Sequence, residues 1–257
     1  MKEQLHVVKV GGAVVEDPAS LSALLSAFAA LPGNKVLVHG GGRAATRLSE
    51  ALGIESRMVS GRRITDDKTL EVVTMVYGGL VNKRIVAGLQ ALGVNALGLT
   101  GADLGYMLSD KRPVGEIDYG WVGDVRAVDI SLLADLVGRG VVPVLAPLTH
   151  DGQGHLLNTN ADTIASAAAR ALSERFDVRL TYCFEKAGVL ADPGDEGSVI
   201  PRITRASYAD LVAAGVVSGG MIPKLGNAFD ALSAGVSQVQ ITRADALDAS
   251  AGTVVTL

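Results

Sequence analysis

Apolar residues along the chain alternate between two kinds of spacing. Short runs rich in β-branched residues predict strands, because such side chains suit a buried pleated sheet. Between these runs, apolar residues three and four positions apart predict helices, and Asp17 followed by Pro18 is typical of a helix N-terminus. The predicted strands are residues 6–10, 35–39, 94–99, 141–148, 178–184, 236–241 and 253–257. The predicted helices are residues 18–31, 43–52, 67–92, 130–137, 158–176, 207–214, 223–234 and 244–251.

This regular alternation of strand and helix predicts an α/β fold. Its core is expected to be an open, mostly parallel sheet sandwiched by helices. Residues 105–128 interrupt the alternation and predict a hairpin that projects from the sheet. A strand restarts after the long Ala-rich helix, so we expect two lobes, residues 1–176 and 177–257.

Composition excludes several classes of protein. The 257 residues include 23 Lys and Arg against 27 Asp and Glu, with no long basic run, so a nucleic-acid surface is not expected. No apolar stretch reaches the roughly 18 residues of a membrane span, and no signal peptide is evident, which predicts a cytoplasmic protein without a membrane partner. Cys183 is the single cysteine, so neither a disulfide within the chain nor a cysteine-built metal site is expected.

Two glycine clusters directly follow predicted strands. Lys9 precedes Gly11-Gly12, and His39 precedes Gly40–Gly42. A glycine-rich turn that leads into a helix presents N–H groups to an anion, although a tight turn alone would explain part of the pattern. Gly40–Ala45 also fits the G-x-G-x-x-A dinucleotide fingerprint, so a dinucleotide-dependent oxidoreductase is one alternative. No lysine follows a glycine, which excludes a Walker A motif.

Two predicted helices begin with residues that helix stability does not fully explain. Asn158, Asn160 and Asp162 alternate at the start of an otherwise apolar helix, and N-capping accounts for one or two of them. The Gly219-Gly220 pair leads into a helix with Lys224 in its first turn. The helix dipole disfavours a cation there, so Lys224 indicates a bound polyanion.

Five motifs in order resemble the amino acid kinase family over essentially the whole chain: KVGG, HGGGR, GRRIT, NTNADT and GGMIPK. The resemblance implies transfer of the ATP γ-phosphoryl group to the side-chain carboxylate of an N-acylated L-glutamate, the second step of arginine biosynthesis. It implies Mg²⁺ with the ATP, an N-terminal lobe that binds the amino acid and forms a homodimer, and a C-terminal lobe that binds ATP. A non-catalytic amino-acid sensor is a further alternative, although a sensor would not need two phosphate-contacting lysines.

The resemblance also implies roles for individual residues. Lys9 and Lys224 would contact the transferred phosphoryl group and the ATP phosphates, and Asp162 would orient both lysines. The implied substrate-binding residues are Gly41, Gly42, Arg63, Asn158 and Asn160. The implied phosphate-binding backbone is that of Gly11 and Gly12. The implied nucleotide-binding residues are Glu185, Gly188, Val189, Leu190, Gly219, Gly220 and Met221. No protein side chain is expected to bind the metal.

The sequence also departs from the pattern of many relatives. Residues 183–186 (CFEK) stand where many relatives have Thr/Ser-Asp-Val beside the nucleotide. Arg62, Lys111 and Arg112 are cations at the expected edges of the substrate pocket, although surface cations are commonly only solvated. Acetyl is the expected acyl group; succinyl is the alternative, because its second carboxylate could pair with an arginine. Relatives that arginine inhibits have a helix before the first strand, so we expect a homodimer without arginine feedback.

Overall fold

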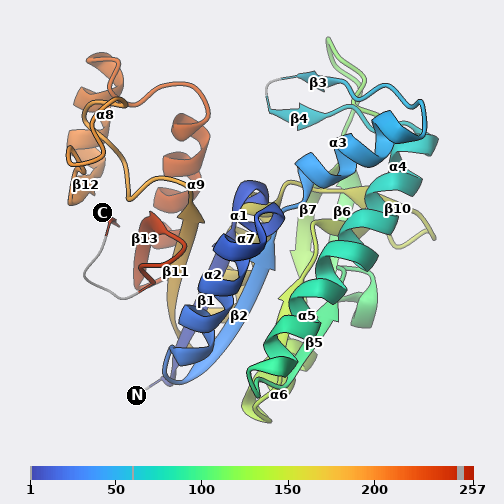
Figure 1. The fold of residues 1–257 in the computed structure, drawn as a ribbon, viewed down its shortest axis with the longest axis horizontal. Coiled ribbons are helices and arrows are strands. Elements are labelled where there is room, and N and C mark those ends of the chain that lie inside the picture. The colour runs from blue at the N-terminus through green and yellow to red at the C-terminus, as the bar shows by residue number, and fades with distance from the viewer. Residues whose placement is uncertain (1, 60, 248–251) are drawn as a thin grey trace.

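The computed structural model describes residues 2–59, 61–247 and 252–257 (Figure 1). Within these ranges the largest sheet has eight strands in the order β12-β14-β13-β11-β1-β2-β8-β5, and each neighbouring pair except β13 with β14 is parallel. The predicted open, mostly parallel sheet is therefore confirmed. Its strands are β1 (Gln4–Val10), β2 (Asn34–His39), β5 (Ala96–Leu99), β8 (Val142–Leu145), β11 (Asp177–Phe184), β12 (Arg202–Thr204), β13 (Gln238–Arg243) and β14 (Thr253–Thr256).

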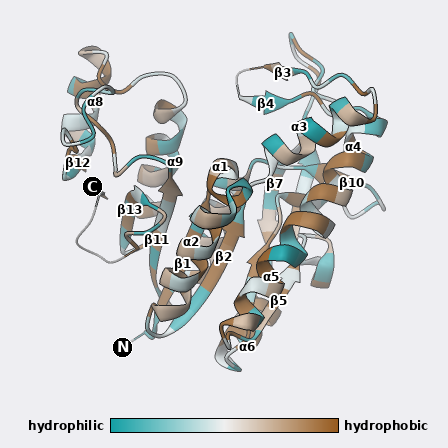
Figure 2. Ribbon diagram, in the orientation of Figure 1, coloured by the Kyte–Doolittle hydropathy of each residue, from teal (hydrophilic) through white to brown (hydrophobic). Residues whose placement is uncertain are grey.

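The central strands are buried because helices cover both faces of the sheet. The last six residues of β1 are all buried. Neighbouring side chains on a strand point to opposite faces, so Val7 packs into one apolar core and Val8 into the other. In Figure 2, β2 changes from hydrophilic at its start to hydrophobic toward its carboxyl end, where its residues are buried. The two cores hold the strands in place and leave the strand ends to carry polar side chains.

The helices form two layers. On one face α2 packs with α5, and on the other α7 packs on β1 and β11 beside α9. The predicted start of α2 is confirmed: Pro18 is its first residue, and the Asp17 carboxylate accepts the N–H of Ser20 at 2.8 Å. The α-helices are α1 (Gly12–Glu16), α2 (Pro18–Ala30), α3 (Gly42–Ala51), α4 (Asp67–Val73), α5 (Asn82–Ala91), α6 (Ser131–Gly138), α7 (Ala161–Leu172), α8 (Arg205–Ala213) and α9 (Met221–Ser233).

The long helix predicted after Asp66 is a continuous helical run with a π-helical middle. Asp66 caps it by accepting the N–H of Thr69 at 2.8 Å, and α4 continues through the π-helix η1 (Thr74–Val81) into α5. By length and composition this run, Asp67–Ala91, could cross a membrane, which the sequence analysis did not anticipate. Its most apolar window is 44% buried within the protein, as expected for a helix that packs on a sheet.

A second sheet stands at the carboxyl end of the first. Strands β6 (Met107–Lys111) and β7 (Gly123–Val128) are antiparallel, which confirms the predicted hairpin, and η2 (Asp103–Gly105) precedes them. The hairpin pairs with β9 (Leu148–His150), and β9 pairs with β10 (Leu156–Asn158). The short strands β3 (Met58–Val59) and β4 (Arg62–Arg63) form a separate pair. In Figure 1 the β3–β4 pair lies beside α3.

Two predicted elements in the middle of the chain have wrong boundaries. Residues 141–148 form two strands rather than one, since the main-chain pairing breaks at Ala146 and Pro147, and proline has no N–H to donate. Asn158 belongs to β10, and α7 starts only at Ala161, because the Asn160 side chain caps it by accepting the N–H groups of Asp162 and Thr163. That helix ends at Leu172 rather than at residue 176.

The C-terminal part also differs in detail from the prediction. Residues 244–247 form a turn rather than a helix, and residues 248–251 of that predicted helix lie outside the described residues. Strand β12 was not predicted, because three residues are too short for a hydrophobic period to show. The sheet continues across position 177, since β11 pairs with β1 along seven residues. The division into two lobes stays a prediction.

Candidate active site

The glycine clusters after β1 and β2 meet at the carboxyl edge of the sheet. In the strand register Val10 lies beside His39, so the two turns that follow are neighbours. A Cβ on Gly40 would lie 3.2 Å from the Gly12 nitrogen, and a Cβ on Gly41 would lie 2.9 Å from the Tyr77 ring. Glycine is therefore required here by the close approach of backbone and ring, and main-chain N–H groups are left near the crevice.

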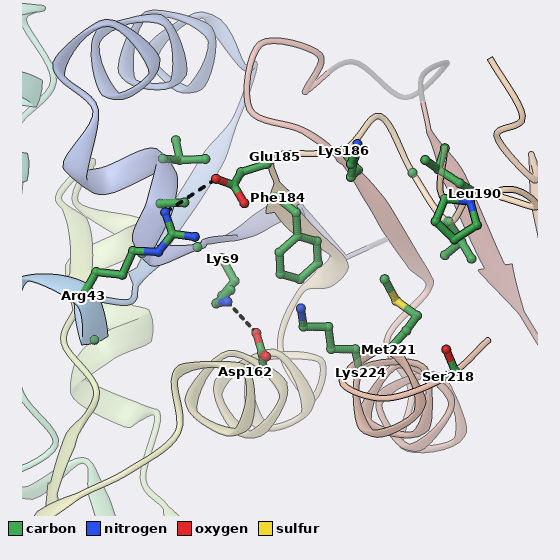
Figure 3. Close-up of a pocket in the computed structure, with 18 of the residues that line it drawn as sticks. Lys9, Arg43, Asp162, Phe184, Glu185, Lys186, Leu190, Ser218, Met221 and Lys224 are labelled. Atoms are coloured by element: carbon green, nitrogen blue, oxygen red, sulfur yellow. Dashed lines mark ion pairs between the residues drawn. The ribbon is translucent and has the colours of Figure 1, made fainter. Parts of the chain in front are cut away.

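A buried ion pair lies below these turns. Lys9, from β1, places its ammonium nitrogen 2.7 Å from a carboxylate oxygen of Asp162, in the first turn of α7 (Figure 3). The two side chains are only 8% and 13% exposed. The Asn160 cap fixes where α7 starts, so it also fixes the position of Asp162 relative to Lys9.

Lys224 approaches the same place from α9. Figure 3 shows its side chain pointing toward Asp162 and Phe184. Burial lowers the pKa of Lys224; the Asp162 carboxylate raises it, and the Lys9 ammonium lowers it further. No ion pair is formed by Lys224 within the described ranges, so its charge is available to an anion in the crevice.

The two lysines and Asp162 line a cavity of about 600 Å³. This volume is in the range of small-molecule and cofactor pockets. Gly219 and Gly220 do not line the cavity, although Ser218 and Met221 on either side of them do. The predicted residues that do line it are Gly11, Gly12, Glu185, Gly188, Val189, Leu190 and Met221.

A second cavity, of about 160 Å³, lies on the other side of the glycine turn. All five residues predicted to bind the substrate line it, namely Gly41, Gly42, Arg63, Asn158 and Asn160. Gly42 also lines the larger cavity, so the two cavities adjoin at this residue. Such an arrangement can bring one reactant from each cavity together beside Lys9.

Arg63 is the buried cation of the smaller cavity, at 6% exposure. Its two terminal nitrogens donate to the Ser56 hydroxyl at 2.6 Å and to the Gly42 carbonyl and Thr46 hydroxyl at 2.8 Å each. Its Nε is buried and has no hydrogen-bond partner. An orphaned buried donor of this kind is costly unless a ligand supplies an acceptor.

Asn158 lies at the end of β10 and is also buried. Its amide donates to the Thr65 hydroxyl at 2.9 Å, which in turn donates to the Arg63 carbonyl. Asn160, by contrast, is exposed and uses its side-chain oxygen to cap α7. Asn158 is thus linked to Arg63 through Thr65, whereas Asn160 caps the helix that carries Asp162.

Sequence reasoning treated His39 as unremarkable, but it anchors the second glycine turn. The ring is fully buried; Nδ1 is 2.8 Å from the Gly40 carbonyl, and Nε2 is 3.1 Å from the Asn82 amide. Asn82 also donates to the Val144 carbonyl on β8. Burial lowers the pKa of His39 to about 4, so the ring is neutral at pH 7. Its position directly before three glycines was the available signal.

The extra cations noted in the sequence are not equivalent. Arg62 lines the smaller cavity; its side chain forms no hydrogen bond or ion pair with the described residues, although the charges of Arg112 and Asp124 act on it. Lys111 instead lies over the Trp121 ring at 3.9 Å, and Arg112 is bound by Asp124. Neither Lys111 nor Arg112 lines the cavity, because each has a partner on the neighbouring segment, although the charge of Arg112 still acts on Arg62.

Comparison with known proteins places this geometry in a family. The profile described as "Amino acid kinase family" matches residues 4–243. The chain belongs to the amino acid kinase family. It is 66% identical over 253 residues to a protein named acetylglutamate kinase from Bacteroides thetaiotaomicron, with 98% of each chain covered. Relatives named as kinases do not support the oxidoreductase or sensor alternatives.

Solved structures of other proteins share the fold. The structure of smu.665 from Streptococcus mutans is 28% identical, covers 98% of both chains and has a TM-score of 0.82. A carbamate kinase from Giardia lamblia, solved with AMP-PNP, has a TM-score of 0.70 over 98% of both chains. At 14% identity the latter shows only that the fold is shared.

Proposed function

We propose that this protein transfers the γ-phosphoryl group of ATP to the side-chain carboxylate of an N-acylated L-glutamate. The observation that carries the proposal is the Lys9–Asp162 pair, with Lys224 beside it, at the junction of two cavities of unequal size. The larger cavity suits a nucleotide and the smaller one an amino acid. The relatives named acetylglutamate kinase at 62–66% identity support the same reaction.

In this mechanism the larger cavity holds ATP with its phosphates toward the glycine turns. Phosphoryl transfer needs in-line positioning and neutralisation of charge more than covalent chemistry from the protein. Lys9 and Lys224 supply two positive charges, and the N–H groups of Gly12 and Gly42 supply further donors. The Gly11 N–H, which the sequence also suggested, instead donates to the Cys183 carbonyl at 3.1 Å. The acceptor is already a carboxylate, so no general base is required, and Asp162 serves to orient Lys9.

The smaller cavity holds the acceptor. The free Nε of Arg63 and the side chain of Asn158 are proposed to bind the α-carboxylate of the glutamate. The γ-carboxylate then points past Gly42 toward Lys9. Blocking the α-nitrogen with an acyl group prevents the amine from attacking the activated γ-carboxylate, which is why a free glutamate would be a poor acceptor.

Mg²⁺ is proposed to enter with ATP. Within the described ranges, no group of three or more His, Cys, Asp and Glu side chains lies close enough to hold a metal ion. The side chain nearest the phosphates, Asp162, is already bound to Lys9. The metal would therefore be held mainly by phosphate oxygens, whose charge it would help to neutralise.

We also propose a homodimer of cytoplasmic protein, formed through the N-terminal lobe. Met75 and Leu80 on η1 are about half exposed, as is Leu104 on η2. Exposed apolar groups of this size are typical of an interface. In this division residues 1–176 bind the acceptor and residues 177–257 bind ATP, and a cytoplasmic location gives access to ATP.

The test is an ADP-release assay with Mg²⁺ and ATP over a panel of acceptors. The panel contains N-acetyl- and N-succinyl-L-glutamate, glutamate, aspartate and carbamate. We expect turnover with an N-acylglutamate at least tenfold above the others, about 1.4 kcal/mol. Turnover with carbamate or aspartate but with neither acylglutamate would contradict the proposal.

A further inference from the structure

Phe184, the last residue of β11, contacts both lysines of the site (Figure 3). The centroid of its ring is 3.8 Å from the Lys224 nitrogen and 5.0 Å from the Lys9 nitrogen. Both distances are within the roughly 6 Å over which an aromatic face attracts a cation. One neutral ring thus lies against two ammonium groups that come from β1 and α9.

The strand register explains the position of this ring. Lys9 lies beside Tyr182 of β11, so Phe184 is two residues further along the same face. The two aromatic rings are stacked, with centroids 6.3 Å apart and an interplanar angle of 7°. Tyr182 is fully buried. Phe184 therefore rests on a fixed neighbour at the edge of the crevice.

The charges around Lys224 show what such a ring can contribute. Lys224 faces Lys9 from β1, Asp162 from α7 and the Phe184 ring from β11. The single carboxylate of Asp162 is bound to Lys9 at 2.7 Å, so it balances two ammonium groups incompletely. The remaining charged side chains of this cavity pair elsewhere: Glu185 with Arg43, and Lys186 with Glu196.

A second carboxylate beside Lys224 would balance its charge but would also repel the phosphates of ATP. The negative face of an aromatic ring attracts the ammonium group without carrying a net charge. An apolar ring also limits the access of water to the lysine, which strengthens any later contact between Lys224 and a phosphate.

We propose that Phe184 is a positioning residue that keeps Lys224 protonated and directed at the phosphate groups in the crevice. This inference rests on the proposed kinase function. It assigns to position 184 a role beyond forming the wall of the cavity, and it explains how two lysines share one carboxylate. Burial lowers the pKa of Lys224. The negative face of the ring, 3.8 Å from the ammonium nitrogen, would oppose that effect.

The first test compares Phe184→Leu, which keeps an apolar side chain without a π face, with Phe184→Tyr, which keeps the ring. We expect Phe184→Leu to lower kcat about 3- to 30-fold, the range of a cation–π contact. The KM for the acylglutamate should change by less than about twofold, since Phe184 does not line the acceptor cavity. The alkaline limb of the kcat profile should move to lower pH, and Phe184→Tyr should restore both properties.

The second test does not depend on activity. Competitive labelling of lysines with acetic anhydride, read by peptide mass spectrometry in the absence of substrates, gives the pKa of Lys224 in each variant. We expect a lower pKa in Phe184→Leu than in the wild type or Phe184→Tyr, with the exposed Lys68 as internal reference. Thermal unfolding checks that each variant is folded, and Phe184→Met provides the same comparison if Phe184→Leu is not.

The outcomes separate the two proposals. An equal Lys224 pKa in all variants would overturn the inference. So would a change confined to the KM for ATP, because the ring would then act only as part of the cavity wall beside the nucleotide base. A wild-type protein that phosphorylates no acylglutamate would contradict the kinase function. Even then, the labelling comparison would still decide whether Phe184 acts on Lys224.

Discussion

Lys9 and Asp162 form a 2.7 Å ion pair although they lie 153 positions apart in the chain. The pair links the end of a central strand to the first turn of α7 and is almost fully buried. Because the pair is shielded from water and the Asp162 carboxylate is fixed, Lys9 is oriented before any substrate binds. It also means that the site and the packing of α7 on β1 depend on the same contact.

Both lysines should act mainly on the chemical step. We expect Lys9→Ala and Lys224→Ala each to lower kcat by about 10²–10³, as is typical for the loss of one electrostatic donor in a transition state. The KM for the acylglutamate should change much less. Steady-state kinetics with both substrates varied would measure this. Lys68→Ala, at an exposed position on α4, is the matched control, and an unchanged kcat in either site variant would remove that lysine from the mechanism.

Arg63 should act mainly on binding of the acceptor. A clamp on the α-carboxylate holds ground state and transition state alike, so Arg63→Ala is expected to raise the KM for the acylglutamate at least tenfold, about 1.4 kcal/mol. Arg63→Lys should not rescue it, because one ammonium nitrogen replaces the two guanidinium nitrogens that donate to Ser56 and to the Gly42 carbonyl, and Nε is lost. Arg139→Ala, at an exposed position, is the control. A fall in kcat at constant KM would argue against the clamp.

Arg62 provides a test of the acyl group. Its side chain lines the acceptor cavity and forms no ion pair there; burial and the nearby Arg112 lower its pKa, and the charge of Asp124 opposes them. We expect Arg62→Ala to reduce the ratio of kcat/KM for N-succinyl- over N-acetyl-glutamate by about tenfold or more, since only succinyl offers a carboxylate to pair with it. Lys111→Ala, which lies outside the cavity, should leave the ratio unchanged. A ratio insensitive to Arg62→Ala would favour acetyl as the acyl group.

His39 should make stability depend on pH. Its pKa is about 4 in the folded protein, below the ordinary value of 6.5, so below pH 6.5 the unfolded chain binds the extra proton first. The contribution of the neutral ring to the free energy of unfolding is therefore fully present above about pH 6.5. It is lost as the pH falls toward 4, and the whole contribution is about 3 kcal/mol. Urea unfolding from pH 7 to pH 4 measures the slope.

The control for this pH dependence is His39→Gln, which offers an amide to Gly40 and Asn82 but does not titrate. We expect the variant to be less stable than the wild type at pH 7 and to lose less stability on acidification. If the free energy of unfolding falls equally for the two proteins between pH 6.5 and pH 4, groups other than His39 dominate the pH dependence.

The parts of the site that follow strands were predictable from sequence. Lys9 and the two glycine clusters end neighbouring parallel strands, and the carboxyl ends of such strands share one edge. Lys224 was marked by its unfavourable position at a helix start. In each case a local pattern was enough, because the geometry of the fold class determines where the pattern lies.

Other parts depended on contacts that no local pattern encodes. Tyr77 reaches Gly41 from a π-helical turn, and Asn82 reaches His39 from the start of α5. The role of Phe184 required the register between β11 and β1. The contact of Lys111 with Trp121, which lies on a different segment of the hairpin region, was likewise not encoded in any local pattern.

The two cavities share a single described lining residue, Gly42, and that residue has no side chain. Substitutions at Met58, Arg62 or Val122 can therefore reshape the acceptor cavity without changing any side chain that surrounds the nucleotide. Because of this division, the specificity for the molecule that receives the phosphoryl group can change in evolution while the use of ATP is retained.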